Sequence, residues 1–214
     1  MKGATCGAAR EIEYLNKEET PTPIAEAKAL ARKRAFAARR AAHAEGLDGR
    51  AGAHLERLLA GLPAGSVVAG YMPIRTEISP LPVMAALVAR GVAVCVPVIR
   101  GAGQGLVFSR WHPGAEMVAG PFGAPVPAQE VLLVPEALIV PLVAFDARGH
   151  RLGYGGGFYD RSFAALRRAG RPVAAIGFAY GAQQLPELPV EPTDQPLDAV
   201  VTEAGIRRFS DLPF

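Results

Sequence analysis

The sequence contains few of the features that define several large protein classes. Only two cysteines, Cys6 and Cys95, occur in 214 residues, so neither a disulfide framework nor a cysteine metal site is expected, and both thiols are expected to be reduced. Proline or glycine interrupts the apolar runs before they reach about 18 residues, which argues against a membrane-spanning helix. The first 20 residues include several acids and no apolar segment, which predicts a cytoplasmic protein rather than a secreted one.

Other absences narrow the catalytic options. The chain has no Gly-x-Ser-x-Gly segment, so a serine hydrolase is not expected. Its four histidines show no paired spacing that would bind a metal. Its one tryptophan, Trp111, follows a predicted strand, where it can belong to the core or the rim or form a platform for a ligand.

The composition is that of a globular protein with an uneven distribution of positive charge. Half of the residues are hydrophobic and a fifth are charged, so we expect an extension over residues 1–21 and one domain over 22–214. The net charge is +3, and a run without acids lies between Glu26 and Glu45. Its basic residues are Lys28, Arg32, Lys33, Arg34, Arg39 and Arg40. This run is open to three interpretations: a solvated helix face, a nucleic-acid surface, or a site for a polyanion such as a nucleotide.

Alternating helix and strand patterns predict an α/β fold. Thr22 followed by Pro23 predicts the start of a basic helix that ends near Gly46, and a second helix spans about 51–59. Further helices are expected over 81–90 and after Gly157. The predicted strands are 66–71, 92–98, 105–111, 137–145, 173–179 and 197–201. We therefore expect a single three-layer domain with a mostly parallel sheet and helices on both faces, Rossmann-like but without a dinucleotide fingerprint.

The segment RLGYGGGFYDR, residues 151–161, is the most unusual stretch of the chain. Four glycines stand in five positions between an apolar strand and a predicted helix. Glycine backbone can approach a phosphate closely, and the first amides of a helix have no partner within the helix. The helix end also carries about half a positive charge. The segment is therefore either an anion-binding loop or a plain flexible connection.

Two familiar phosphate loops do not fit this segment. A Walker loop ends in Gly-Lys-Ser or Gly-Lys-Thr, whereas this loop ends in Gly-Gly-Phe. A dinucleotide fingerprint requires a third glycine where Phe158 stands. The residues FDARGH also separate the strand from the loop.

Charged residues on both sides of the loop favour a nucleotide with a metal ion. Asp160 in the first helical turn interacts favourably with the helix dipole, but a phosphate bound there would repel its carboxylate. A divalent ion with oxygen ligands, Mg²⁺ above all, reconciles the two negative groups. Arg151 is positioned to bind phosphate on the other side of the loop. The residues therefore predict a Mg-nucleotide site that is not of the Walker type.

A second set of candidate residues follows the first predicted strand. Tyr71, Met72 and Glu77 belong to the segment YMPIRTEISP, at the carboxyl end of that strand. Open α/β sheets bind ligands at this edge. Glu77 is either a binding residue or an unpaired surface acid.

These segments resemble the 5-formyltetrahydrofolate cyclo-ligase family, also called 5,10-methenyltetrahydrofolate synthetases. RLGYGGGFYDR resembles the nucleotide-binding signature of that family, and Lys28 to Arg32 resembles its Lys-x-x-x-Arg element. YMPIRTEISP is similar to its folate-side segment and EPTDQPLDAVVTE to its closing segment, which includes Asp194 and Asp198. The resemblance spans about residues 26–203. Some relatives have a lysine in the glycine run, where this chain has Gly156, so backbone amides and the basic helix must supply more of the positive charge.

The resemblance implies an ATP-dependent ring closure of 5-formyltetrahydrofolate to 5,10-methenyltetrahydrofolate. The γ-phosphoryl group is transferred to the formyl oxygen, N10 of the folate attacks the activated carbon, and ADP and phosphate are released. Phosphoryl transfer requires positioning and charge neutralisation more than a protein nucleophile. The absence of a Ser-His or Cys-His pair is therefore expected.

The resemblance also implies a role for each candidate residue. The expected ATP-binding residues are Lys28, Arg32, Arg151, Gly153, Gly155, Gly156, Gly157 and Tyr159. The expected catalytic residues are Arg151, Tyr159 and Asp160. Folate is expected at Tyr71, Met72, Glu77, Tyr154 and Phe158, with Trp111 as a wall against which the pterin stacks. Asp160 and Asp194 are expected to bind Mg²⁺.

Two other functions compete with the cyclo-ligase. One is a phosphosugar-binding α/β enzyme such as an isomerase, which would use the glycine loop for phosphate without ATP. The other is a nucleic-acid-binding protein that uses the basic helix, although base-stacking aromatics are not interleaved with its positive residues. We expect a cytoplasmic monomer with small-molecule substrates, namely ATP and a reduced folate whose polyglutamate tail would suit the basic surface, and neither nucleic acid nor membrane as a partner.

Overall fold

An eight-stranded mixed sheet forms the centre of the computed structural model, which describes residues 22–63 and 65–214. In spatial order its strands are β12 (Gly205–Arg208), β11 (Ala199–Thr202), β10 (Ala174–Phe178), β7 (Ala137–Pro141), β1 (Val67–Ala69), β2 (Ala93–Ile99), β3 (Leu106–Arg110) and β6 (Leu132–Leu133). The pairs from β11 to β2 are parallel, whereas β12, β3 and β6 pair antiparallel at the two edges. The predicted mostly parallel sheet is confirmed.

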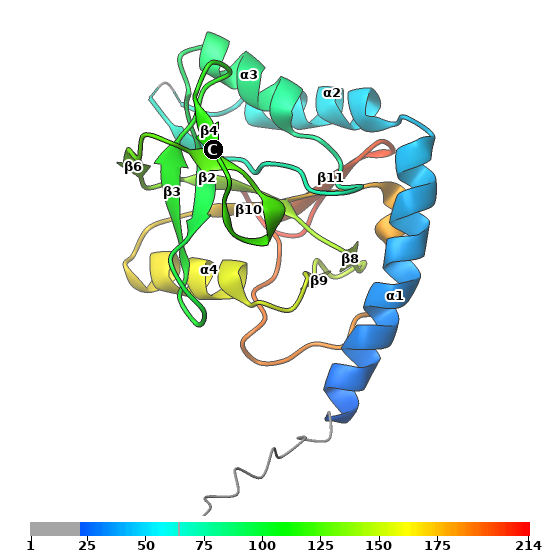
Figure 1. Cartoon of the computed structure of the whole chain (residues 1–214). Coiled ribbons are helices and arrows are strands. Elements are labelled where there is room, and N and C mark those ends of the chain that lie inside the picture. The colour runs from blue at the N-terminus through cyan, green and yellow to red at the C-terminus, as the bar shows by residue number, and fades with distance from the viewer. Residues whose placement is uncertain (1–21, 64) are drawn as a thin grey trace, which may run out of the picture.

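Helices cover both faces of the sheet, as the sequence predicts. Helices α2 (Asp48–Leu59) and α3 (Leu81–Ala89) pack on one face, and α4 (Phe158–Arg168) packs on the other (Figure 1). Successive strand residues point to opposite faces, so Val68 belongs to the α2/α3 core and its neighbour Ala69 to the α4 core. The apolar strands are buried on both sides for this reason.

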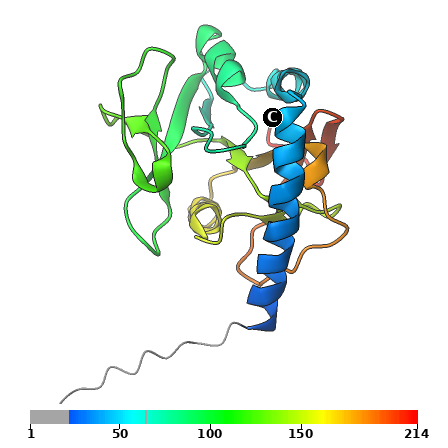
Figure 2. The same cartoon turned by 45° about the vertical axis from the view of Figure 1, so that its right-hand side comes forward.

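Helix α1 (Pro23–Ala44) lies across the carboxyl ends of the parallel strands. Its first turn is capped as predicted, because the Ala25 amide donates to Thr22 Oγ1 at 3.4 Å. Small residues on one side of α1, Ala31 and Ala35, pack against the segment that follows β7. Helix α1 also contacts the 3₁₀ turn η2 (Gly181–Gln183), which follows β10. Figures 1 and 2 show α1 alongside this edge in both views.

The predicted strand 137–145 is divided in the structure. The sheet strand β7 ends at Pro141, and the separate strand β8 (Ala144–Phe145) pairs with β9 (Arg151–Leu152). Gln183 Nε2 donates to the carbonyl groups of Leu142 and Val143, which satisfies the backbone at the break. This β8–β9 hairpin carries the chain away from the sheet and delivers Arg151 to the start of the glycine segment.

Several short elements were not predicted. They are the edge strands β6 and β12, the hairpin strands β4 (Met117–Val118) and β5 (Val126–Pro127), and the 3₁₀ turn η1 (Pro121–Gly123). The predicted extension, residues 1–21, and Cys6 lie outside the described residues. Cys95 is a free thiol buried in β2, and burial raises its pKa to about 12. Within residues 22–63 and 65–214 there is no helix that combines the length and the apolar character needed to span a membrane.

The packing of α4 predicts a large effect on stability from one substitution. Phe163 is fully buried between α4 and the sheet. We expect Phe163→Ala to lower the free energy of unfolding by about 3–5 kcal/mol, because it removes buried apolar area and leaves a cavity. Urea denaturation measures this difference. The matched control is Arg168→Ala on the exposed side of the same helix, and equal unfolding curves for the two variants would contradict the packing described.

Candidate functional site

The glycine segment forms a loop between β9 and the N-terminus of α4, at the carboxyl edge of the parallel strands. Gly155 and Gly157 have φ values of +104° and +63°, which other residues adopt only with strain. Gly157 is the N-cap of α4, so the first amides of the helix lie beside the loop. The local sequence thus provides an exposed turn of backbone at the positive end of a helix dipole.

Helix α1 contributes the guanidinium of Arg32 to this loop. Arg32 Nε donates to the Gly153 carbonyl at 2.8 Å. A Cβ atom at Gly155 would lie 3.2 Å from Arg32 Nη2, so only glycine leaves room for the guanidinium in its present position. On the other side of the loop, Arg161 Nη2 donates to the Gly156 carbonyl at 2.6 Å. Arg32 and Arg161 therefore flank Gly156, the position discussed above as a lysine in some members of the similar family.

Lys28, one turn before Arg32 on α1, is buried and forms ion pairs with two carboxylates that are more exposed. Its Nζ is 2.7 Å from Glu191 Oε2 and 2.7 Å from Asp194 Oδ2. Burial lowers the pKa of Lys28, but hydrogen bonds to Asp194 and Glu191 more than offset it, and the pKa lies above its usual value. Lys28 is therefore charged at neutral pH. The ion pairs join α1 to the segment before β11.

Arg151 and Asp160 form the third ion pair of the site. Arg151 Nη2 donates to Asp160 Oδ1 at 2.7 Å, and Arg151 Nη1 donates to the Gln195 carbonyl. The Gln195 amide donates to the same Asp160 oxygen at 2.9 Å, so one residue fixes both partners. Burial lowers the pKa of Arg151, with Asp160 opposing that change. The side chain of Arg151 is only 5% exposed and also lies over the Phe163 ring.

These contacts place Asp160 next to the backbone that follows Asp194, the other predicted metal ligand. Asp160 binds the amide of Gln195, and Asp194 is the residue before it. Each carboxylate uses one oxygen in its ion pair, Oδ1 in Asp160 and Oδ2 in Asp194. Within the described ranges, no group of three or more His, Cys, Asp or Glu side chains is placed to hold a metal. Two carboxylates nevertheless suit Mg²⁺, which takes its other ligands from phosphate and water.

Tyr159, in the first turn of α4, is partly buried against the α4 core. Burial raises the pKa of Tyr159, with the Glu77 charge adding to the effect. Its hydroxyl is therefore protonated at neutral pH and can act as a hydrogen-bond donor but not as a base. Its ring packs near Phe163, with the centroids 6.5 Å apart.

The folate-side candidates meet the glycine loop through a residue that the sequence analysis did not single out. Arg39 of α1 donates to the Tyr154 hydroxyl at 2.9 Å and to Thr76 Oγ1 at 3.2 Å. Glu77 is buried beside it and accepts a 2.9 Å hydrogen bond from the Ile74 amide. Burial raises the pKa of Glu77, although the Ile74 amide and Arg39 oppose the change. Glu77 is thus a buried acid with defined partners, and the interpretation as an unpaired surface acid is wrong.

Three more of the residues predicted to contact folate differ in their surroundings. Tyr71 is buried, and its hydroxyl donates to the Ile78 carbonyl at 2.6 Å. Met72 is partly buried against the α2/α3 core. Trp111 follows the antiparallel strand β3, where it is 7% exposed within that same core. Stacking of a pterin on Trp111 would require its neighbours to move, so this role remains a prediction.

Sequence reasoning missed Arg39, Glu191 and Gln195 as residues of the site. A signal was present for Arg39, because positions 28, 32 and 39 recur at helical spacing and share a face of α1. No comparable signal marks Glu191 or Gln195. Both lie in a segment without periodicity, and their partners are more than 30 residues away in the chain.

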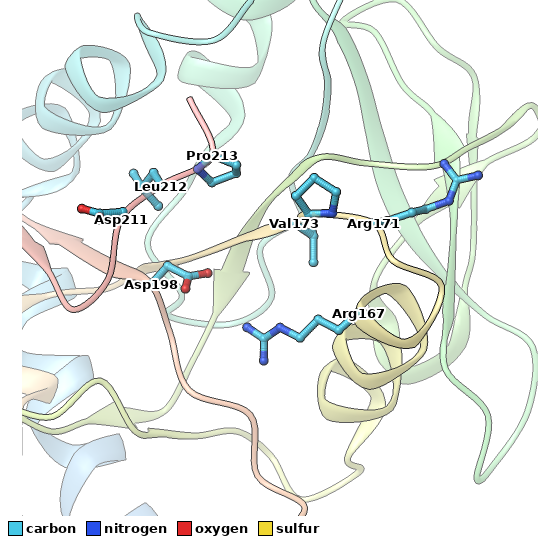
Figure 3. A pocket seen from close by; sticks show the side chains of 8 residues that line it. Arg167, Arg171, Val173, Asp198, Asp211, Leu212 and Pro213 are labelled. Carbon is cyan, nitrogen blue, oxygen red and sulfur yellow. The ribbon is translucent and has the colours of Figure 1, made fainter.

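A separate cavity of about 380 Å³ lies at the opposite edge of the sheet, where β10 and β11 begin (Figure 3). It is lined by the end of α4, including Arg167, and by the C-terminal segment around Asp211. Asp198 faces it but accepts hydrogen bonds from the Ala175 amide and the Ser210 hydroxyl. Asp198 therefore ties strands together, whereas Asp194 belongs to the glycine-loop site.

Parallel α/β proteins bind ligands at the carboxyl ends of their strands. Here that edge carries a helix N-terminus, a glycine loop and paired charges, which together define a phosphate-binding α/β enzyme. The chain belongs to the 5-formyltetrahydrofolate cyclo-ligase family, whose model matches residues 24–203. It is an ATP-binding ligase of folate one-carbon metabolism that converts 5-formyltetrahydrofolate to 5,10-methenyltetrahydrofolate. This assignment selects the cyclo-ligase over the isomerase and the nucleic-acid-binding protein.

Individual relatives agree with the family assignment. The chain is 36% identical over 145 residues to 5-formyltetrahydrofolate cyclo-ligase of Escherichia coli K12, covering 65% of this chain and 79% of that protein. It is 31% identical over 148 residues to the protein of the same name from Mycolicibacterium smegmatis, covering 65% and 74%. The solved 5,10-methenyltetrahydrofolate synthetase of Aquifex aeolicus superposes with a TM-score of 0.65 at 28% identity, covering 86% of this chain and 93% of that structure.

Proposed function

We propose that the glycine loop binds the triphosphate of ATP, with Lys28, Arg32 and Arg151 as its charged partners. The observation that carries this proposal is that these three cations, from two distant parts of the chain, are joined by direct contacts to the glycine loop and the segments that flank it. Arg32 contacts Gly153, and Arg151 begins the hairpin that leads into the loop. Lys28 is joined to the same region through Asp194 and Gln195. Backbone amides of residues 153–157 would complete the contacts.

Asp160 and Asp194 would hold Mg²⁺ at this site. When bound, the ion would neutralise phosphate charge and help to orient the triphosphate. Binding also requires an exchange of partners, because both carboxylates are paired with phosphate-binding cations in the structure. A carboxylate that turns to the metal frees Lys28 or Arg151 for phosphate. This exchange supports the binding of ATP and Mg²⁺ together rather than separately.

A cavity of about 660 Å³ between the start of α1, the turn before β9 and residues 187–190 offers a place for the base of the nucleotide. Its lining includes Ile24, one turn before Lys28 on α1, and His150, next to Arg151. Leu188 and Val190 add apolar surface. A flat, mostly apolar base with a polar edge suits such a lining.

The folate would lie on the other side of the loop, between Tyr154 and Glu77. The formyl oxygen of the amide is a poor leaving group. Transfer of the γ-phosphoryl group to this oxygen lets it depart as phosphate. N10 then attacks the formyl carbon, loses its proton, and phosphate departs with the former formyl oxygen. Arg151 and Lys28 would stabilise charge during the transfer, and the Tyr159 hydroxyl would donate a hydrogen bond. The second step is intramolecular, so orientation alone can supply about 7–11 kcal/mol.

We further propose that the chain works as a monomer in the cytoplasm on a folate that can carry a polyglutamate tail. Exposed basic residues of α1, such as Lys33 and Arg40, offer attractive charge for a polyanionic tail.

The decisive test of the proposed mechanism follows product and nucleotide together. We expect the methenyl product to form, with one ADP released per product, only when 5-formyltetrahydrofolate, ATP and Mg²⁺ are all present. Absorbance of the product and a coupled ADP assay measure the two yields. Equal product formation after chelation of Mg²⁺ would contradict the metal assignment, and product without ADP would contradict the phosphorylation step.

A further inference from the structure

Arg39 is the most deeply buried basic residue among the described residues, and the proposed function gives it no role. It is 1% exposed, although it belongs to the basic helix α1. A buried guanidinium is costly unless its N–H groups are paired. The hydrogen-bond and ion-pair partners of Arg39 therefore indicate its role in the structure.

Two of the three guanidinium nitrogens connect separate parts of the folate side. Nε donates to Thr76 Oγ1 at 3.2 Å, in the segment after β1. Nη2 donates to the Tyr154 hydroxyl at 2.9 Å, in the glycine loop. The guanidinium also lies near the rings of Phe36 and Tyr154, at 5.2 and 5.7 Å from their centroids. Arg39 thus fixes the loop relative to the segment that carries Glu77.

The third nitrogen faces the carboxylate of Glu77. Arg39 Nη1 is 3.8 Å from Glu77 Oε1, and both side chains are at most 5% exposed. Nη1 is buried and, within the described residues, makes no hydrogen bond. The distance is just beyond hydrogen-bonding range, so the interaction is an ion pair that acts through charge. In a buried site such a charge acts strongly on its neighbour.

We propose that Arg39 is a positioning residue for the folate half of the site, which keeps Glu77 as a carboxylate and holds the Tyr154 hydroxyl in place. The proposal rests on the proposed function, in which Glu77 and Tyr154 contact folate. A carboxylate is acceptor-only and can receive hydrogen bonds from the N–H groups of a pterin, whereas a protonated carboxyl loses part of that capacity. Arg39 would not touch the folate itself.

The groups around Glu77 support this role for Arg39. Buried Tyr71, in the same segment as Glu77, and Tyr154 and Tyr159, from the glycine loop and the start of α4, interact with its charge, and Arg75 lies two residues away. Burial raises the pKa of Glu77, while the charge of Arg39 lowers it more than that of Arg75. Loss of Arg39 would therefore raise the pKa of Glu77 further. Folate binding would then weaken at low pH and recover as the pH rises and Glu77 ionises.

The test compares ligand affinities of Arg39→Met with those of the wild type. We expect the Kd for 5-formyltetrahydrofolate, measured by calorimetry without ATP, to rise by about 10- to 100-fold at neutral pH, as for loss of one charge-assisted interaction. The Kd for MgATP should change less than about twofold, since Arg39 lies on the folate side of the loop. As the pH rises, the folate affinity of the variant should increase, because Glu77 without Arg39 ionises only at higher pH, while the affinity of the wild type should depend less on pH.

Two further variants separate this role from a structural one. Arg39→Lys keeps the charge but cannot reach all three partners, so it should restore the weaker pH dependence of the wild type with intermediate affinity. Arg57→Met removes the same charge from the exposed side of α2, which has no role in the site, and should behave as wild type. Folate affinity of Arg39→Met within twofold of wild type, or equal losses for folate and MgATP at every pH, would overturn the proposal. Failure of the wild type to bind the folate would instead refute the proposed function.

Discussion

Asp160→Asn is expected to lower kcat by about three orders of magnitude. The substitution keeps the size of the side chain but removes the charge that would hold Mg²⁺, and loss of one transition-state electrostatic partner typically costs about 10²–10³ in rate. It also leaves Arg151 without its carboxylate, so the guanidinium would no longer be held in one orientation. Steady-state production of the methenyl product measures the loss. The affinity for Mg²⁺ in the presence of ATP should fall in parallel.

The matched control for this prediction is Asp211→Asn. Asp211 is exposed at the far edge of the sheet and should leave kcat unchanged. Asp160→Asn should also lower the free energy of unfolding, because a buried arginine loses its partner. We expect about 1–3 kcal/mol, since Asp160 is 27% exposed and water can partly replace it. A folded Asp160→Asn protein with wild-type kcat would exclude the carboxylate from the mechanism.

Lys28→Met is expected to raise the KM for ATP by about 100-fold. The substitution removes a cation from the triphosphate site and leaves Glu191 and Asp194 unpaired beside incoming phosphates. The effect should therefore exceed the loss of one contact, because repulsion is added to lost attraction. Initial rates at varied ATP concentration and saturating folate measure the change. The KM for 5-formyltetrahydrofolate should change little.

A second substitution tests that explanation. Glu191→Gln in the Lys28→Met background removes one of the two uncompensated charges and should recover part of the ATP affinity. Lys33→Met, on the exposed side of α1, serves as the control for the loss of a positive charge from the same helix. If Lys33→Met raised the KM for ATP as much as Lys28→Met, the general charge of α1 rather than the ion-pair cluster would be responsible.

Most of the fold could be predicted from the sequence because its signals are local. Thr22 and Pro23 define the start of α1, and continuous apolar runs mark the buried parallel strands. The failures share a physical cause. The two-residue strands β4, β6 and β9 exist only because another segment pairs with them, and the division of 137–145 depends on Gln183, about 40 residues away. The apolar pattern of residues 137–145 does not indicate that Gln183 binds this segment.

Some features of the site could likewise be predicted from the sequence, whereas others depend on the tertiary structure. The sequence by itself indicated the glycine loop, the cations of α1 and the carboxylate at 160, because their residue types and spacing favour phosphate chemistry without reference to partners. Asp194 followed only from the resemblance to the cyclo-ligase family. Only the tertiary structure decided how these charges pair: Lys28 with Glu191 and Asp194, Arg151 with Asp160, and Arg39 against Glu77. Pairing depends on distances between residues far apart in the chain, and folding alone fixes those distances.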